Sequence, residues 1–486
     1  MTSMRKIPIK LSIWWIRRDL RLFDNMALRA AMKNHAYVMP LYLLDPILLD
    51  ARIVGSKRRA LLLGGLKSLA NDLVLRGSQL VIRSGKPQEV FNQLKKDYEI
   101  SAIYAEEDFS PYARQRDKEI AQDFPLVLIG HPTVYHPSKV LKNDGNPYVV
   151  YSPFMHVWRS RNFNDLGTLI STPEHIPSLS DIHSDPLPET GNQEHNSFVP
   201  GETAAQHILS DFLDGTQAAV RGYKDNRDRM DRDLTSHLSP YLKFGMISVR
   251  QVIISVLQAI ADVPGNEQAE GIHTWLNQII WRDFYYSILY HYPHVVGNPF
   301  REKYANIPWI GDKTVFDSWK VGMTGYPIVD AANRQLINSG WVHNRARMIT
   351  ASFLTKNLLI DWRCGEAWYM HNLVDADLAN NNGGWQWVAG CGTDAAPYFR
   401  IFNPITQSQK FDPMGEYIRR WVPELQHVPD DMIHTPWKMS AKMQAAISCI
   451  IGKNYPHPII ELKFSRQRVL NVYKQSIDEY YKNMRS

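Results

Sequence analysis

Five short apolar runs near the start of the chain restrict its fold more than any other feature. They cover residues 11–16, 37–44, 79–82, 102–105 and 126–129, and segments with helical periodicity separate them at residues 25–33, 57–76, 87–98 and 113–122. This alternation predicts a doubly wound parallel α/β (Rossmann-like) domain, with ligands at the carboxyl ends of the strands. Neither GxGxxG nor GxxxxGK[ST] follows any of these runs, so nothing here indicates a site for NAD or a P-loop nucleotide.

The composition changes after the alternating region. Residues 171–202 are rich in Pro, Ser, Asp, Glu, Asn and His and hold few large apolar residues, which is typical of a long connector. From about residue 204 onwards the strand patterns stop and amphipathic helical patterns dominate. We therefore predict an α/β domain at residues 1–134, an interdomain linker at residues 135–204 and an all-helical domain at residues 205–486.

Bulk properties exclude several classes of protein. No apolar run in the 486 residues approaches the ~18 needed to span a bilayer, and the basic first residues do not resemble a secretory signal. Three distant cysteines fit a reducing compartment and exclude a disulfide framework. No Cys or carboxylate cluster completes a metal-ligand set around the histidines. We expect a cytoplasmic protein without a metal, and its net charge of +6 is compatible with a polyanionic partner without requiring one.

Three polar patterns in the second half could carry chemistry. Ser239 precedes a proline, which predicts a helix N-cap, and the hydroxyls just before it could form either a phosphate cradle or a plain cap. On the following helix, a mixed polar and aromatic stripe suits a cavity better than a core, and the helix after residue 343 presents a similar face. The first stripe holds Gln278, Trp281, Arg282 and Tyr285, and the second holds Asn344, Arg347 and Met348.

The densest pattern is the run at residues 375–387, which is continued at residues 392–404. It sets two carboxylates, three successive amides, two glycines and two indoles among apolar neighbours. Burying so many polar groups is costly without polar partners. The run therefore predicts either a site for a ligand with a hydrogen-bonding ring edge or a polar network that fixes a helical core.

These segments resemble the photolyase/cryptochrome family. The resemblance rests on residues 235–242, 281–285, 324–331, 340–356 and 375–404, and on the opening run at residues 17–25, and it covers nearly the whole chain in family order. It implies an FAD held in the helical domain and UV-damaged DNA as the partner. The implied FAD-binding residues are Tyr223, Thr235, Ser236, His237, Leu238, Ser239, Trp275, Arg282, Asn344, Arg347, Asp375, Ala376, Asp377 and Asn381.

The resemblance also implies individual roles. Arg347 pairs with Asp375, Asn381 faces flavin N5, and three tryptophans relay electrons from the surface (Trp309, Trp362 and Trp385). The residues implied to bind damaged DNA are Arg227, Gln278, Trp281, Arg282, Asn344, Arg345, Met348 and Trp387. Of these, Trp281 and Trp387 match the pair that clamps a pyrimidine dimer flipped out of the stack.

Within the family, the chain looks most similar to class I enzymes that split cyclobutane pyrimidine dimers. Asn344 and Met348 stand where enzymes for (6-4) lesions carry histidines, but Gln278 replaces the usual glutamate of dimer photolyases and matches (6-4) enzymes. The resemblance thus implies a deoxyribodipyrimidine photo-lyase, with a cryptochrome photoreceptor or (6-4) repair as alternatives. Residues 109–112 lack the glutamate of folate-binding members, although Glu106 and Glu107 lie nearby. The resemblance therefore leaves four alternatives for a second, antenna chromophore: a deazaflavin, a flavin, a folate or an empty site. We expect a monomer with no obligate protein partner.

Overall fold

Residues 9–128 build a five-stranded parallel sheet, as the sequence predicts. The computed structural model describes residues 9–33, 35–189, 197–214, 218–263 and 266–484. Strands pair in the order β3-β2-β1-β4-β5, so the strand order reverses between β1 and β4. The strands are β1 (Ile9–Ile16), β2 (Val38–Leu44), β3 (Val81–Ser84), β4 (Tyr98–Ala105) and β5 (Leu126–Leu128).

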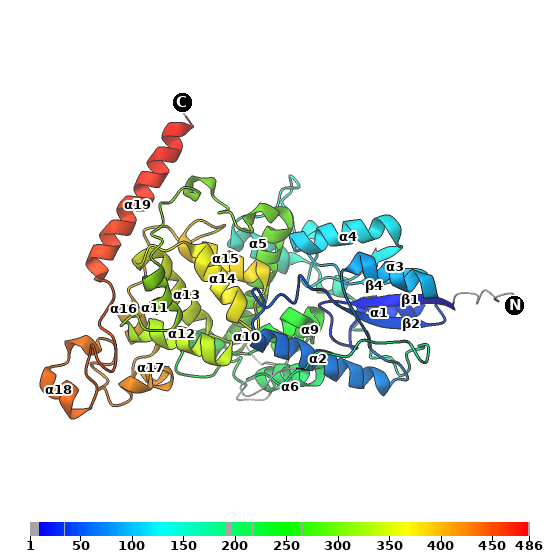
Figure 1. Ribbon diagram of the computed structural model, residues 1–486, viewed down its shortest axis with the longest axis horizontal. Coiled ribbons are helices and arrows are strands. Elements are labelled where there is room, and N and C mark those ends of the chain that lie inside the picture. The colour runs from blue at the N-terminus through cyan, green and yellow to red at the C-terminus, as the bar shows by residue number, and fades with distance from the viewer. Residues whose placement is uncertain (1–8, 34, 190–196, 215–217, 264–265, 485–486) are drawn as a thin grey trace. The chain divides into compact units, whose positions relative to one another are not determined.

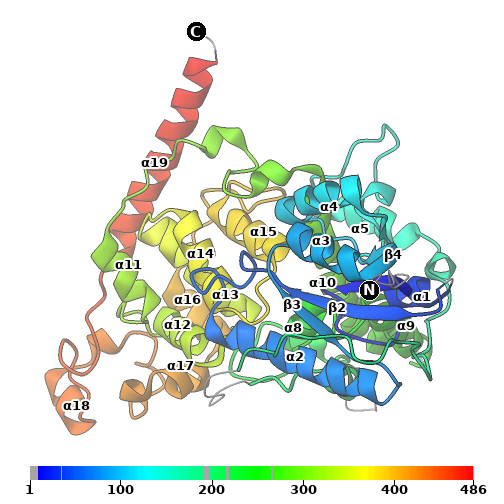
Figure 2. The ribbon, with the colours of Figure 1, turned by 45° about the vertical axis from the view of Figure 1, so that its right-hand side comes forward.

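Helices cover both faces of this sheet. Figure 2 shows α3 and α4 on one face and α2 on the other. Ile13, Leu41 and Ile103 are fully buried on their strands, as expected for parallel strands that are covered on both sides. The helices are α1 (Met26–Lys33), α2 (Ser56–Val74), α3 (Pro87–Asp97) and α4 (Pro111–Asp123), all within a few residues of the predicted ranges. The doubly wound fold is therefore confirmed.

The segment at residues 135–204 holds more structure than the predicted linker. It contains helix α5 (Tyr151–Ser160), and the buried Trp158 of this helix donates a hydrogen bond to Asp283 at 3.0 Å. In the described part of residues 171–201 there is no named helix or strand, but Ile176 is buried and Ile182 packs into the core of the sheet. Isolated anchors of this kind have no periodicity, so the sequence pattern does not reveal them.

The chain divides into two compact units by the packing of its backbone. The sheet unit comprises Met1–Pro147, Phe154–Arg221 and Ser236–Tyr290, and the helical unit comprises Tyr148–Pro153, Gly222–Thr235 and His291–Ser486. The chain passes between the units more than once. The predicted division at residues 134 and 204 is a different partition and stays a prediction.

Helices dominate both units after the sheet (Figure 1), which confirms the second half of the fold prediction. The sheet unit adds α6 (Glu202–Leu213), α8 (Ser239–Phe244), α9 (Val249–Ala261) and α10 (Asn266–His291). The helical unit holds α7 (Tyr223–Asn226), α11 (Lys313–Lys320), α12 (Pro327–Ser339), α13 (Asn344–Ser352), α14 (Trp362–Asn372), α15 (Leu378–Ala389), α16 (Pro404–Phe411), α17 (Glu416–Trp421), α18 (Ala441–Ala446) and α19 (Leu462–Asn483).

Candidate functional site

An ion pair joins α13 to the segment before α15 in the helical unit. Arg347 on α13 donates to Asp375 at 2.9 Å and to the carbonyl of Val342 at 2.7 Å. The Asp375 side chain is 4% exposed, whereas the Arg347 side chain is 26% exposed. His343 starts α13 by accepting the N–H of Arg345 at 3.1 Å, and this cap sets the orientation of the helix. The pair implied by the resemblance is present, and its guanidinium retains an accessible side.

Helix α15 begins at the second carboxylate of the same run. Asp377 is its N-cap and accepts from the backbone N–H of Asn380 at 3.1 Å and from its side chain at 2.7 Å. Asn381, one position later, donates its side-chain amide to the backbone carbonyl and to Oε1 of Glu366 on α14, both at 3.1 Å. Burial raises the pKa of Glu366, and the hydrogen bond from Asn381 opposes this shift. Glu366 was missed in the sequence, because a single glutamate in a helical pattern carries no motif.

Several buried polar atoms of the helical unit have no hydrogen-bond partner in the described structure. Two of them belong to residues discussed above or implied to bind FAD, Nε2 of His343 and Oγ1 of Thr235. Burial lowers the pKa of His343 to about 4, so its ring is neutral near pH 7. Leaving a buried polar group unsatisfied costs about 1–3 kcal/mol. A polar ligand that bonds to either atom would remove that cost for it.

The tryptophans implied in electron relay all belong to the hydrophobic core of the helical unit. Trp362 and Trp385 are buried, and Trp309 packs against the same core with its ring 6.1 Å from that of Tyr473. The ring of Trp385 lies 5.2 Å from Tyr369 and 6.3 Å from Trp319. Among the described residues, no ring contact joins Trp309, Trp362 and Trp385 to one another. Their role as a relay stays a prediction.

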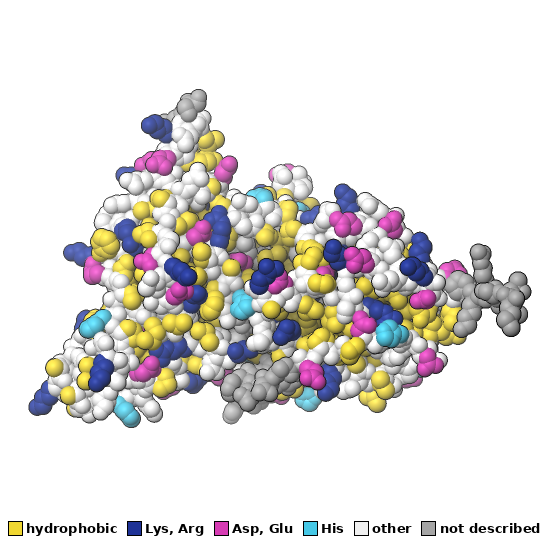
Figure 3. All heavy atoms as spheres, viewed as in Figure 1, with side chains coloured by type: hydrophobic (Ala, Val, Ile, Leu, Met, Phe, Trp, Pro, Cys, Tyr) yellow, Lys and Arg dark blue, Asp and Glu magenta, His cyan; other side chains and the backbone are white. Residues whose placement is uncertain are grey.

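Two arginines implied to contact DNA differ in their surroundings. Arg345 donates to Asp228 at 2.9 and 3.2 Å and lies over the ring of Phe411 at 4.4 Å. Arg227 is exposed, and no ion pair is recorded for it in the described helical unit. On the face drawn in Figure 3, basic and acidic side chains are interspersed. Net charge alone therefore does not locate a surface for DNA.

The remaining implied residues of the helical unit pack as follows. Asn344 donates to the sulfur of Met348 at 3.7 Å, so these two residues share one face of α13 as predicted. Ala376 and Tyr223 are buried, and burial raises the pKa of Tyr223 to about 12. Trp387 is partly buried against the core.

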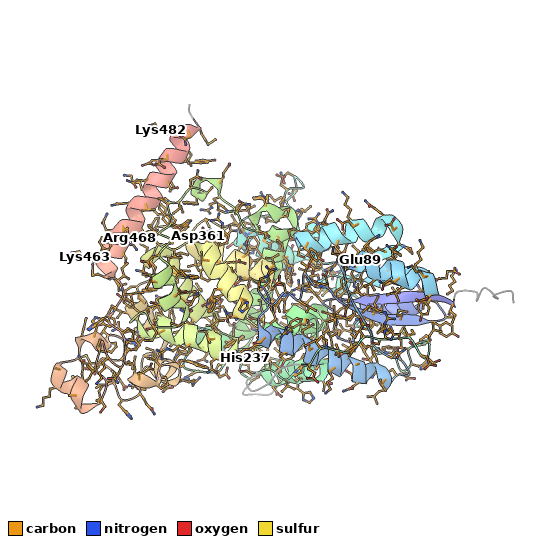
Figure 4. The ribbon with its side chains drawn as sticks, in the orientation of Figure 1. Glu89, His237, Asp361, Lys463, Arg468 and Lys482 are labelled. Atoms are coloured by element: carbon orange, nitrogen blue, oxygen red, sulfur yellow. The ribbon has the colours of Figure 1, made fainter. Side chains whose placement is uncertain are left out.

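In the sheet unit, the predicted phosphate cradle adopts an unusual backbone. Helix α8 begins at Ser239 itself, after Leu238, and shows no side-chain cap, so the predicted N-cap at Ser239 is off by one residue. His237, which is labelled in Figure 4, lies between Ser236 and Leu238. Its φ of 49° falls in the left-handed region. A turn of this kind directs the chain sharply into the helix.

Helix α10 carries the predicted stripe of the sheet unit. Gln278 donates to the carbonyl of Thr274 on its own helix at 3.3 Å, and the ring of Trp281 lies 5.6 Å from that of Tyr285. Trp275 is buried against Phe212 with the ring centroids 5.1 Å apart. Arg282 donates to the carbonyl of Pro132 at 2.5 Å. The side chain of Arg282 is thus bound to the segment that follows β5.

A doubly wound sheet unit and a helical unit with a buried polar cluster define a two-part ligand-binding protein. Residues 275–475 match the FAD binding domain of DNA photolyase, and residues 12–174 match DNA photolyase. The deoxyribodipyrimidine photo-lyase of Synechococcus sp. is 38% identical over 482 residues, covering 95% of this chain and 96% of that protein. The chain therefore belongs to the DNA photolyase family.

Solved structures agree with this assignment. A cryptochrome of Synechocystis sp. superposes with a TM-score of 0.87 at 29% identity, covering 96% of this chain and 100% of that chain. An archaeal photolyase from Sulfolobus tokodaii, solved with two FAD molecules, superposes with a TM-score of 0.80 at 29% identity, covering 96% and 99%.

The residues of the helical unit fit FAD. This cofactor brings a diphosphate, sugar and ribityl hydroxyls and a ring edge that both donates and accepts hydrogen bonds. The unpartnered Oγ1 of Thr235 and Nε2 of His343 can bond to such groups, and the open side of Arg347 offers further N–H donors. Among the described residues, no group of three or more His, Cys, Asp or Glu could hold a metal ion.

Proposed function

We propose that this chain is a light-driven DNA repair enzyme, a deoxyribodipyrimidine photo-lyase that splits cyclobutane pyrimidine dimers. The observation that carries the proposal is the 38% identity to the photo-lyase of Synechococcus sp. along 95% of the chain. Trp281, Met348 and Trp387 support the same function, since they match dimer-contacting positions of the resemblance.

Excited reduced FAD, when bound, supplies the electron that cleaves the dimer. The protein supplies position and hydrogen bonds. Arg347 and Asp375 fix one another at 2.9 Å, which gives the cofactor a rigid charged wall. Glu366 holds the amide of Asn381 in one orientation, and this leaves the amide oxygen of Asn381 available as an acceptor.

Damaged DNA is the partner in this proposal. Trp281 and Trp387 offer flat surfaces on which the flipped pyrimidines stack, and Arg227 and Arg345 bind phosphates. A dimer pairs poorly in the duplex, so its extrusion costs less than that of an intact base. We propose a monomeric, cytoplasmic enzyme without an obligate protein partner. No described helix is long and apolar enough to cross a membrane.

A second chromophore is part of the proposal. The photolyase of Sulfolobus tokodaii was solved with two FAD molecules and discussed as having a novel light-harvesting cofactor. By analogy, we propose that this chain also takes an antenna, which is a flavin, a deazaflavin or a folate.

Two other functions have specific support. The Synechocystis cryptochrome superposes with a TM-score of 0.87, equal to that of a photolyase from Agrobacterium tumefaciens, so the fold is also compatible with a cryptochrome-type photoreceptor. Gln278 matches (6-4) enzymes. One assay separates all three. Reduced protein is given DNA with a defined cyclobutane thymine dimer or a defined (6-4) product, in light and in darkness. We expect light-dependent repair of the cyclobutane dimer. Repair of the (6-4) product alone, or of neither lesion, would overturn the proposal.

A further inference from the structure

The positive charge of the chain is concentrated near its C-terminal end. Of the 55 Lys or Arg and the 49 Asp or Glu among the 486 residues, the 46 residues 432–477 hold seven and one, which leaves 48 of each in the other 440 residues. The net charge of +6 therefore comes from residues 432–477 alone, which we call the basic segment. It lies within the helical unit and includes α18 and most of α19. Its cations are Lys438, Lys442, Lys453, Lys463, Arg466, Arg468 and Lys474.

Most of these cations are not neutralised by the protein itself. Six of the seven are exposed and have no ion pair among the described residues. The seventh, Arg468, is partly buried and donates to the carbonyl of Asn357 at 2.6 Å. The single carboxylate, Glu461, is the N-cap of α19 and accepts from the backbone N–H groups of Lys463 and Phe464 at 2.8 and 2.7 Å. Because Glu461 caps the helix, the six exposed cations are accessible to an anionic partner.

Helix α19 carries three of the exposed cations on one side. Lys463 and Lys474 are eleven positions apart, about three turns, so they lie nearly in line along the helix. Arg466 is less than about a quarter turn away from both. Figure 4 shows Lys463 at the start of this helix, and in Figure 3 further dark-blue side chains lie over α18 at the lower left. The opposite side of α19 is packed and holds the buried Ser465, Val469, Tyr473 and Ser476.

The start of α19 lies at the far end of a helix from Arg345, one of the two arginines that we propose bind damaged DNA. Arg345 is in the first turn of α13, and this helix continues directly into a π-helical turn that ends at Asn357. At about 1.5 Å of rise per residue, Arg345 and Asn357 are roughly 15–20 Å apart. Asn357 donates to Oγ of Ser465 at 3.0 Å and accepts from Arg468 at 2.6 Å. These two bonds hold α19 at the end of α13 that is remote from Arg345.

The chemistry of the exposed side favours a nucleic acid over other polyanions. A helix that lies on a membrane turns its apolar face to the lipid, whereas Val469 and Tyr473 of α19 are buried in the core of the helical unit. The exposed side instead adds the amides of Gln467 and Asn471 to the cations, and such side chains contact phosphates. Duplex DNA carries one negative charge per about 1.7 Å of its axis, which suits cations spread along several turns of helix.

We propose that the basic segment binds the phosphate backbone of intact duplex DNA, at a surface distinct from the arginines that bind damaged DNA. The inference rests on the proposed function only in taking DNA as the polyanion. A protein that contacts a second stretch of duplex in this way can pass from one stretch to another without complete dissociation. The contact carries no sequence information, because it is made to phosphates.

A triple variant of the FAD-loaded protein tests this surface: Lys463→Ala, Arg466→Ala and Lys474→Ala. All three side chains are exposed, and alanine favours the helix, so α19 should stay folded. Binding of a fluorescent intact duplex is followed by anisotropy across a series of salt concentrations. Each lost phosphate contact lowers the slope of log affinity against log salt by about 0.9, so we expect the slope to fall by about 2–3.

A second triple variant is the matched control: Lys67→Ala, Lys96→Ala and Lys118→Ala. It removes three exposed lysines from the sheet unit and changes the net charge by the same amount. We expect its slope to equal that of the wild type. An unchanged slope in the first triple variant, or an equal fall in the control, would overturn the proposal.

Competition and repair assays identify the partner and separate the two proposals. Polyglutamate and phosphatidylglycerol vesicles, at equal total charge, should displace the labelled duplex much less than unlabelled duplex does. Displacement as effective as that by duplex DNA would overturn the choice of DNA. Light-driven repair of a dimer in a saturating short single strand should be equal in the wild type and both triple variants. Absence of repair in all three would count against the proposed function, while the salt slopes would still decide the role of the basic segment.

Discussion

Each unit contains a buried arginine–aspartate pair, and the two pairs differ in what surrounds them. In the sheet unit, Arg17 donates to both carboxylate oxygens of Asp117 at 2.7 Å, and both side chains are 6% exposed. Arg116 donates to the same carboxylate at 2.9 Å, and both guanidiniums lie 4.7 Å from the ring of Trp15. In the helical unit, Arg347 gives Asp375 one bond at 2.9 Å and is 26% exposed.

This difference indicates that the Arg17–Asp117 pair stabilises the fold, whereas the Arg347–Asp375 pair is accessible to a ligand. We call them the closed pair and the open pair. The closed pair connects the end of β1 to α4, and its carboxylate is surrounded by two guanidiniums. In the open pair, Arg347 keeps N–H donors on its accessible side. His343, whose Nε2 has no hydrogen-bond partner in the described structure, lies four residues earlier in the same unit. Substitution in the closed pair should therefore lower the stability of the fold, and substitution in the open pair should weaken the binding of FAD.

The largest effect should come from the closed pair. Asp117→Ala leaves Arg17 buried without its partner, which should lower the free energy of unfolding by about 3–5 kcal/mol. Urea titration of the wild type and the variant measures this loss, and the flavin content of the folded variant should stay normal. Glu119→Ala, an exposed change on the same helix, should alter stability by less than about 0.5 kcal/mol. An Asp117→Ala protein that is as stable as the wild type but has lost its flavin would contradict the assignment of this pair to stability.

The open pair should show the opposite behaviour. Asp375→Ala should weaken FAD binding by about 1.5–3 kcal/mol, the value of a hydrogen bond to a charged group, because Arg347 is no longer held in place. Equilibrium dialysis of flavin-free protein against FAD measures the affinity. Urea titration without FAD should show a much smaller loss than that of Asp117→Ala, because Arg347 is partly exposed to water. Equal losses in the two flavin-free variants would show that the pairs do not differ in role.

Sequence patterns predicted some of these features and missed others for physical reasons. Buried parallel strands and α10 are recognisable because their apolar or polar positions repeat with a fixed period. Glu366 and Asp228 carry no such repeat. They reach Asn381 and Arg345 only through tertiary packing, across 15 and 117 positions of sequence. The burial of Ile182 within an otherwise polar connector depends in the same way on the surface that it meets.

A smaller effect is expected at the two arginines that we propose bind DNA. Asp228 already neutralises Arg345, whereas Arg227 has no recorded ion pair. Arg227→Ala should reduce the slope of log affinity against log salt by about 0.9, the value for one phosphate contact on duplex DNA. Arg345→Ala should reduce the slope by less, and Asp228→Ala should increase it by freeing Arg345. The slope is measured for the wild type and the three variants by titrating each with dimer-containing and with intact DNA across a series of salt concentrations. Equal slopes for the two arginine variants would contradict this distinction.

The smallest expected change concerns Gln278, whose amide is bound only weakly to its own helix at 3.3 Å. Gln278→Glu should keep FAD and DNA binding and raise the yield of dimer repair, because an acid can bond to or protonate the developing thymine anion. One better hydrogen bond in the transition state is worth about 1–3 kcal/mol, but a photochemical yield has a ceiling that limits the visible gain. Repair of a defined cyclobutane dimer under identical light compares the two proteins. A Glu variant that repairs less would show that Gln278 is adapted to another lesion.

The central claim is that Thr235, His343, Arg347 and Asp375 of the helical unit bind FAD. The most direct test releases the flavin of the purified, cofactor-saturated protein by denaturation and identifies and quantifies it by chromatography and absorbance. The account predicts FAD in stoichiometric amount, and much less FAD in Asp375→Ala handled in the same way. Wild-type protein that retains no flavin after saturation with FAD would contradict it.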